Sequence, residues 1–398
     1  MIIYNVRIVP VTSETIENGY IEISGDKILS LGAMDALENI PEEDGFDASG
    51  LTAYPAFVDA HCHIGMFADG LGFEGDDGNE ETDPATPHLR AIDAVNPMDL
   101  CFEEAAFGGV GTVITGMGSA NPVGGTFLAM KTYGSKRADR RIVKYPLAMK
   151  LALGENPKSV YHDKNETPTT RMATAAVIRE QLLTAKRYME DCAEYERTKG
   201  TDDETSRPDF DMKCEALIPL LRREIKAHFH CHRADDIFTA IRLSEEFELD
   251  YVLIHATEGY LIADELPCGT NIVAGPIFGD RCKPELKNAS ISNAAVLAEN
   301  GMTVALCTDH PENPIQYLPA MAGLAIRGGM SEAEALRAIT INPAKICGIE
   351  NRVGSLEAGK DADIVLFRGS FFELSNAPEA AVMGGKLIFN KGERGVRV

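Results

Sequence analysis

The chain has 398 residues, of which 44% are hydrophobic, and its 38 Lys and Arg against 61 Asp and Glu give a formal net charge of −23. This length is long for one domain and suits a large domain with a smaller companion. So acidic a chain repels nucleic acid and anionic membrane surfaces, which argues against a polynucleotide substrate.

The sequence predicts neither a leader peptide nor a membrane span. Residues 1–10 lack the basic start and apolar stretch of a secretory signal, and no apolar run approaches the ~20 residues needed to cross a bilayer. The nine Cys are dispersed, without a CxxC pair, which is typical of reduced thiols. We therefore expect a cytoplasmic protein that acts on a small molecule and has no membrane or nucleic-acid partner. The sequence does not determine whether the protein forms a homo-oligomer.

The two ends of the chain share one pattern, short runs in which apolar and polar residues alternate. Tyr20–Ile23 and Lys27–Leu29 show it near the N-terminus, and Lys386–Phe389 belongs to a similar stretch near the C-terminus. A period of two is typical of short antiparallel strands. We therefore predict one small β domain assembled from both chain ends, residues 1–55 and 346–398.

Between these ends, short apolar runs rich in Val, Ile and Ala alternate with longer helical patterns. This alternation is typical of βα units around a parallel sheet, and eight strands favour a closed (β/α)8 barrel over residues 56–345. Helices are expected over 170–199, 235–248 and 331–339, the last opened by a capping-box pattern. The predicted strands are Phe57–His63, Gly109–Gly116, Thr126–Tyr133, Leu147–Leu153, Lys226–Cys231, Tyr251–Ala256, Asn271–Phe278 and Thr303–Asp309.

One predicted loop differs from the others in length and composition. Residues 65–97 follow the first barrel strand and are rich in Gly, Asp and Glu. A long loop in this position usually forms a lid or a wall of the substrate pocket. A solvated acidic excursion explains the same composition equally well, so both interpretations stay open.

Polar residues stand at the C-terminal ends of five predicted strands, where a buried strand should be apolar. In a barrel these ends meet at one mouth, where active sites lie. Residues two apart in a strand project to the same side, so a His-Cys-His run can hold one metal ion. This joint placement predicts a metal centre at the mouth. The residues concerned are His61, His63, Lys150, His230, His232, His255 and Asp309.

Three segments of the chain resemble the amidohydrolase superfamily. Pro55–Gly65 (PAFVDAHCHIG) is similar to its first-strand signature, Ala338–Lys345 to its last helix, and Gly354–Leu366 to its return into a small β-sandwich domain. The motifs stand in the expected order over nearly the whole chain. The resemblance is closest to the branch of imidazolonepropionase and the zinc-dependent prolidase-like dipeptidases. It implies a metal-dependent hydrolase with a (β/α)8 TIM barrel and a β-sandwich domain from both chain ends.

Carried over residue by residue, the resemblance implies a binuclear centre. His61 and His63 would bind the more buried metal, while His230 and His255 would bind the second. Asp309 would touch the first metal and act as the proton-transfer group. Zinc is expected from this imidazole-rich set of ligands, with manganese and iron left open.

Lys150 stands where binuclear members carry a carboxylated lysine that bridges two divalent metal ions. An ion pair with Glu155 is the alternative. His232 is expected either to contact the substrate or to support a ligand. Arg233 is expected either to clamp a substrate carboxylate or to pair with the aspartates that follow it.

The expected reaction is hydrolysis of a C–N (amide) bond in a dipeptide, N-acyl amino acid or cyclic amide, not of an ester or phosphate. A hydroxide held by the metals would attack, with Asp309 as the proton shuttle and His255 holding the metal that polarises the carbonyl. The alternative is a mononuclear ring hydrolase of the imidazolonepropionase or deaminase type, which lacks the lysine bridge. A non-catalytic scaffold is the remaining alternative, and the presence of every expected ligand type argues against it.

Overall fold

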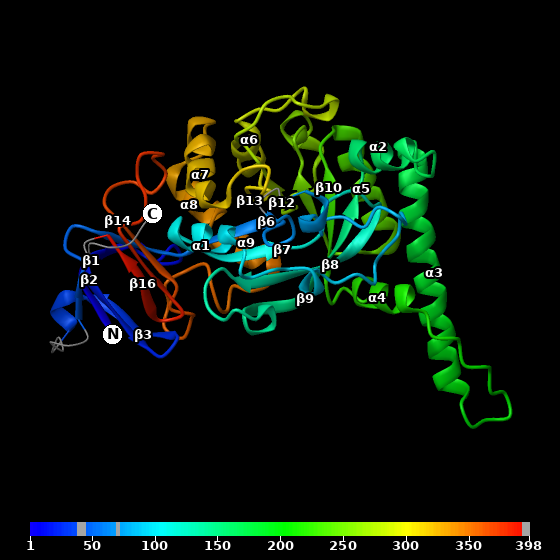
Figure 1. Cartoon of the computed structure of the whole chain (residues 1–398), viewed down its shortest axis with the longest axis horizontal. Coiled ribbons are helices and arrows are strands. Elements are labelled where there is room, and N and C mark those ends of the chain that lie inside the picture. Colours follow the sequence, from blue (N-terminus) through cyan, green and yellow to red (C-terminus); the bar gives the residue numbers. More distant parts are fainter. Residues whose placement is uncertain (38–44, 69–71, 392–398) are drawn as a thin grey trace.

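The computed structural model describes residues 1–37, 45–68 and 72–391. Its strands form two eight-stranded sheets, a central barrel and a sheet at the end of the molecule that holds β1 and β16 in Figure 1. Some predicted residues lie outside the described ranges: 38–44 and 392–398 of the small β domain, and 69–71 of the acidic loop.

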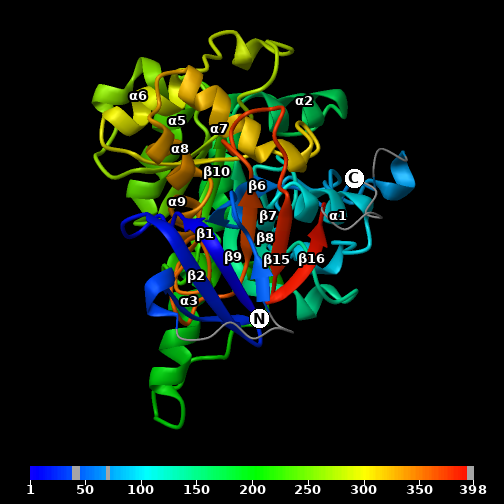
Figure 2. The same ribbon diagram turned by 90° about the vertical axis from the view of Figure 1, so that its left-hand side faces the viewer.

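The end sheet combines strands from both ends of the chain, which Figure 2 shows in blue and red. Its order is β16-β15-β14-β5-β1-β2-β3, with β4 beside β1. Because β5 hydrogen-bonds to both β1 and β14, the strands from the two chain ends form one continuous sheet. The bounds are β1 Ile2–Ile8, β2 Ile16–Ser24, β3 Lys27–Ala33, β4 Gly45–Asp47, β5 Thr52–Pro55, β14 Ile364–Phe367, β15 Ala380–Met383 and β16 Lys386–Asn390.

The barrel sheet follows chain order from β6 to β13. Backbone hydrogen bonds close it, because Asp309 N donates to His61 O (3.2 Å) and His63 N donates to His310 O (2.8 Å). All eight predicted strands are found, seven of them with shifted ends. The bounds are β6 Phe57–Cys62, β7 Val110–Thr115, β8 Val123–Lys131, β9 Ile142–Ala152, β10 Lys226–Cys231, β11 Tyr251–His255, β12 Asn271–Ala274 and β13 Thr303–Leu306.

The third barrel strand corrects the prediction of a regular (β/α)8 barrel. β8 runs antiparallel to both β7 and β9, whereas the other neighbouring pairs from β6 to β13 are parallel. A parallel crossover needs about a dozen residues or more, usually with a helix. Only residues 116–122 join β7 to β8, and only 132–141 join β8 to β9. These short connections leave room for hairpin-like turns alone.

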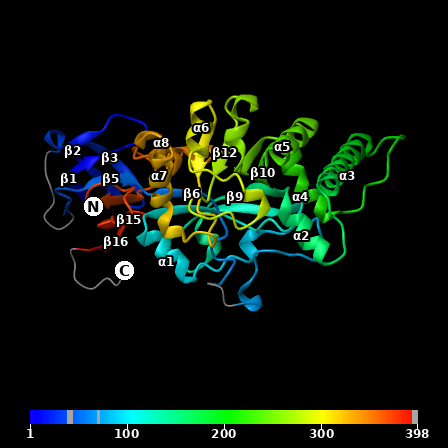
Figure 3. The ribbon, with the colours of Figure 1, turned by 90° about the horizontal axis from the view of Figure 1, so that it is seen from above.

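The three helices expected from periodicity are present as α3, α5 and α8. Ser331 caps α8 by accepting a hydrogen bond from Glu334 N (3.2 Å). The far end of α3 extends beyond the barrel (Figures 1 and 3). No helix in the described ranges combines the length and apolarity that crossing a membrane requires. The bounds are α1 Leu100–Phe107, α2 Glu155–Asp163, α3 Arg171–Thr198, α4 Met212–Leu221, α5 Ala234–Phe247, α6 Asn293–Glu299, α7 Leu318–Arg327, α8 Glu332–Ala338 and α9 Ile341–Cys347.

Strand β14 links the two hydrophobic cores of the molecule. Its side chains alternate between the faces of the end sheet, as the period of a strand requires. Ile364 and Leu366 belong to the core of the end sheet, while Val365 and Phe367 belong to the larger core of the barrel. The end sheet therefore packs against the barrel through one face of this strand.

The acidic loop 65–97 divides into two parts. The stretch 72–82 is mostly exposed, as a solvated excursion would be. The stretch 85–90 instead packs along β8, where Ala85 pairs with Val123 and Arg90 with Thr126. The exposed stretch 72–82 therefore fits a solvated excursion, while the stretch 85–90 extends the barrel sheet beside β8.

Candidate metal centre

The strand ends bring His61, His63 and Asp309 together at the barrel mouth. Asp309 Oδ1 lies 3.6 Å from His61 Nε2 and 3.3 Å from His63 Nε2. The ligand atoms of His61, His255 and Asp309 all lie within 4.8 Å of one another. The structure therefore contains one compact group that is able to hold a metal ion, with His63 in contact with it.

Backbone carbonyls set the ring orientation of two histidines. His63 Nδ1 lies 2.7 Å from Gly116 O, and His255 Nδ1 lies 2.6 Å from Gly275 O. Because a carbonyl oxygen only accepts, each Nδ1 must carry a proton. In a neutral ring, Nε2 then keeps its lone pair, which is the form that binds metals. Burial lowers the pKa of His255 to about 4, so this ring is neutral near pH 7.

The contact between His63 and Asp309 tests whether a cation fits here. With Nδ1 held by Gly116 O, His63 turns Nε2 toward the Asp309 carboxylate, and 3.3 Å separates Nε2 from Oδ1. Asp309 Oδ1 is buried and has no hydrogen-bond partner in the described part of the chain. A divalent ion could be bound by both Nε2 and Oδ1, which are ligand atoms of the kinds that metals take in proteins. The donor set therefore fits a divalent cation.

Lys150 projects from β9 into the same group and is fully buried. Its Nζ lies 3.2 Å from His61 Nε2 and 5.5 Å from the centre of the Phe127 ring. Burial lowers the pKa of Lys150 to about 8, so a fraction of the amine is neutral near pH 7. The expected alternative, a Glu155 partner, is not formed among the described residues, and the Glu155 carboxylate instead accepts from Glu285 N (3.3 Å).

Three histidines form a second group that is able to hold a metal ion. The ligand atoms of His230, His232 and His255 lie within 4.8 Å of one another. Burial and the neighbouring His255 lower the pKa of His230 and His232 well below the usual range, so both rings are neutral. His255 belongs to both groups, which makes them one continuous site. The distances therefore do not favour His230 over His232 as a metal ligand.

The backbone is strained where two of these side chains enter the mouth. His255, Ala256 and Asp309 have φ values of 70°, 43° and 53°. This left-handed region costs a non-glycine residue roughly 1–2 kcal/mol. Strain of this kind persists where the surrounding structure enforces it, which is typical of functional sites.

Three polar residues that lie beside the second group were not predicted from the sequence. Asn156 Nδ2 lies 3.4 Å from His230 Nε2, and Asn156 Oδ1 accepts from Lys283 Nζ (3.0 Å). Lys283 also lies 3.1 Å from Glu285 Oε1, a buried carboxylate oxygen 3.6 Å from His232 Nε2. These residues come from the start of α2 and from the loop after β12. Polar residues are ordinary in such places, so the sequence carried no signal to find them.

Asp59 was also missed, although a charged residue inside an apolar strand was a signal. Its carboxylate accepts from His61 N (3.1 Å), from Thr308 N (3.1 Å) and from Thr308 Oγ1 (2.5 Å). Burial raises the pKa of Asp59 to about 7. These bonds tie β6 to the end of β13 and thereby hold His61 beside Asp309.

Arg233 follows the second interpretation that the sequence left open. Its Nε and Nη2 each lie 2.9 Å from an oxygen of the Asp235 carboxylate. This two-point ion pair occupies the guanidinium fork at the start of α5. The structure therefore gives Arg233 a local partner and no contact with the groups of ligands.

Known proteins resemble this chain in sequence and in fold. The sequence profile of the amidohydrolase family matches residues 52–388. The crystal structure of an amidohydrolase from Thermotoga maritima MSB8 has a TM-score of 0.90 at 39% identity, covering 98% of this chain and 99% of that one.

Two curated protein sequences match this chain over unequal lengths. The amidohydrolase tasK of Hapsidospora irregularis is 29% identical over 395 residues, 92% of this chain. The imidazolonepropionase of Geobacillus thermodenitrificans is 38% identical over 111 residues, 26% of this chain. The matched parts span 40% of the first relative and 26% of the second.

Proposed function

The chain belongs to the amidohydrolase family, and from that membership we propose that it hydrolyses a carbon–nitrogen (amide) bond of a small molecule. The proposed substrates are dipeptides, N-acyl amino acids or cyclic amides. We do not expect the protein to hydrolyse esters or phosphates. The observation that carries this proposal is the pair of three-residue groups that share His255 at the barrel mouth. Family membership supports a metal-dependent hydrolase, and the carbon–nitrogen bond is our further inference.

We assign the ligands as the resemblance to the amidohydrolase superfamily implies. His61, His63 and Asp309 would hold one ion, and His230 and His255 the other. Bound divalent ions would supply a Lewis acid and an acidified water. Imidazole nitrogens predominate in this set, which favours zinc.

Asp309 is placed to move the proton in this reaction. Burial raises its pKa, but His255, His63 and Lys150 together outweigh burial and leave the pKa below its usual value. The carboxylate is therefore ionised near pH 7. It would take the proton released as water attacks the amide carbon, and it would pass that proton to the leaving nitrogen.

Lys150 would determine whether two ions bind. Its neutral amine can add to CO2, which forms an N–C bond and releases one proton to give a carbamate. The fully buried position beside His61 and the lowered pKa support this modification. The carbamate oxygens would then complete both groups of ligands.

A second candidate is a mononuclear hydrolase of a ring amide. The similarity to imidazolonepropionase over 26% of the chain favours it. This alternative requires one ion per chain and an unmodified Lys150, so metal stoichiometry separates the two proposals.

Elemental analysis of the purified protein, followed by a screen of amide substrates, tests the proposal. We expect two ions per chain, and we expect Lys150→Ala to lower this number to one or none. Lys186→Ala, an exposed lysine on α3, serves as the control and should keep both ions. Two ions in Lys150→Ala would contradict the bridge. One ion in the unaltered protein, with turnover of ring substrates alone, would favour the second candidate.

A reducing, cytoplasmic location is proposed as well. All nine cysteines are free thiols, and seven of them are buried or half-buried. This pattern supports a compartment that keeps thiols reduced.

A further inference from the structure

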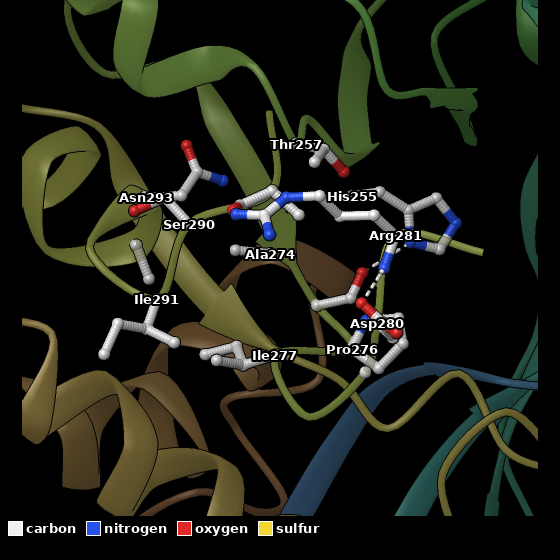
Figure 4. Close-up of a pocket in the computed structure, with 14 residues that line it drawn as sticks. His255, Thr257, Ala274, Pro276, Ile277, Asp280, Arg281, Ser290, Ile291 and Asn293 are labelled. Carbon is white, nitrogen blue, oxygen red and sulfur yellow. Dashed lines mark hydrogen bonds between the residues drawn. The ribbon is translucent and has the colours of Figure 1, made fainter. Parts of the chain in front are cut away.

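A cavity of about 220 Å3 lies beside His255 at the mouth of the barrel. Its walls come from the end of β12 and from the loop that follows, residues 275–292 (Figure 4). His255 and Thr257 line one side, while Arg281 and Ser290 line it from the loop. The cavity is therefore lined by a proposed metal ligand and by a loop that has no role in the proposed reaction.

Most polar side chains around this cavity hold its walls together. The Thr257 hydroxyl bonds to an imidazole of the second metal group, and the Ser290 hydroxyl bonds to a neighbouring serine. The Asn293 amide is engaged by two backbone groups. Asp280 accepts from the backbone N–H of Arg281 (2.7 Å), a bond drawn in Figure 4.

The guanidinium of Arg281 differs from these groups. It carries five N–H donors, and its one side-chain hydrogen bond within the described residues is a long contact from Nη2 to Ala289 O (3.4 Å). No carboxylate of the described chain forms an ion pair with it, whereas Lys283 and Arg233 nearby are each paired with one. Among the described residues, the positively charged guanidinium of Arg281 therefore has no carboxylate partner, and its N–H donors are available to a molecule bound in the cavity.

We propose that Arg281 binds a carboxylate of the substrate and thereby selects amides that bear a free carboxylate, such as N-acyl amino acids and dipeptides. This inference rests on the proposed amide hydrolysis and narrows its substrate class. A guanidinium matches a carboxylate with two parallel hydrogen bonds, which fixes the orientation of the bound molecule. Carboxylate binding, which was one of the two roles expected for Arg233, is thus assigned to Arg281 in the loop after β12.

The remaining walls indicate what accompanies the carboxylate. They are apolar and of small or medium size, and they would accept an aliphatic side chain of the substrate. These walls come from Ala274, Pro276, Ile277, Ile291 and Ala294.

N-acetylleucine and N-acetylleucinamide, each in both enantiomers, provide a matched pair that differs in the terminal carboxylate. With the metal-loaded enzyme, we expect acetate release from the acid at a kcat/KM about ten- to a hundredfold above that for the amide. Arg281→Gln should remove this preference by raising KM for the acid. The same variant should change kcat/KM for the amide by less than about threefold.

Lys287→Gln removes a positive charge from an exposed residue of the same loop and should keep the preference. An equal acid-to-amide ratio in Arg281→Gln and in the unaltered enzyme would overturn the inference while leaving amide hydrolysis intact. Turnover of neither compound would contradict the proposed function for this class. Calorimetric binding of the same pair to metal-loaded Asp309→Asn, with and without Arg281→Gln, then decides Arg281 separately. Absent binding of the acid, or unchanged binding in the double variant, would overturn it.

Discussion

Asp361 joins the end sheet to the barrel, and its replacement by Asn tests this junction quantitatively. Its carboxylate lies 2.5 Å from Lys27 Nζ of β3, 2.8 Å from Lys131 Nζ of β8 and 2.8 Å from Arg352 Nη2. Burial raises the pKa of Asp361, but the three cations outweigh burial and lower it to about 2 from 3.8. Its side chain is 4% exposed, so solvent screens these pairs little on the Asp361 side.

The shift in pKa gives the free energy. A folded-state pKa below the unfolded-state value means that the ionised carboxylate stabilises the fold. The contribution is complete above the unfolded-state pKa and is lost as the pH falls through about 2. At 1.36 kcal/mol per pKa unit, it amounts to about 2 kcal/mol at pH 7 and about 1 kcal/mol at pH 3.

Urea unfolding followed by far-UV circular dichroism measures this contribution, since the chain has no Trp for fluorescence. Asp361→Asn should lower the free energy of unfolding by about 2 kcal/mol at pH 7 and by about half as much at pH 3. Asp264→Asn, at an exposed carboxylate, should stay within about 0.5 kcal/mol of the unaltered protein. An equal loss at both pH values would refute the reasoning, because the loss would then not depend on the ionised carboxylate.

Two further predictions concern the metal centre. Asp309→Asn should keep the fold and most of the metal. It should lower kcat by about 10² to 10⁴, because the proton-transfer group is lost. A near-normal kcat would show that Asp309 does not transfer the proton. Removal of metal by a chelator should lower Tm by several degrees in calorimetry, because ions that bind the folded state alone stabilise it. His61→Ala should show a smaller chelator effect, and an unchanged effect would contradict its assignment as a ligand.

The barrel strands were predictable because buried parallel strands are continuous apolar runs. β10 occupies the predicted residues Lys226–Cys231, and β11 ends one residue early at His255. The direction of β8 was not predicted, since an apolar run has the same pattern in both directions. The connections of 116–122 and 132–141 contained the missing information, because neither is long enough for a parallel crossover.

The candidate site was predictable only at the strand ends. His61 lies in β6 and Asp309 follows the end of β13 by three residues, so the barrel mouth brings them together. The orientation of the His255 ring depends on Gly275 O, a contact that no sequence pattern encodes. Lys283 and Arg281 belong to the loop after β12, and their positions follow from how that loop packs, not from any periodicity.

The reversal of β8 decides which of its side chains lie beside the proposed ligands. Its first half lies toward the mouth, where the Phe127 ring stacks on His61 with 5.2 Å between ring centroids and 16° between planes. Its last residue, Lys131, lies at the opposite end and pairs with Asp361 and Asp363 beside the end sheet. A parallel third strand would carry this lysine toward the metal groups, where its charge would oppose cation binding. The antiparallel course therefore puts an aromatic ring beneath a proposed ligand and a cation at the junction between the two sheets.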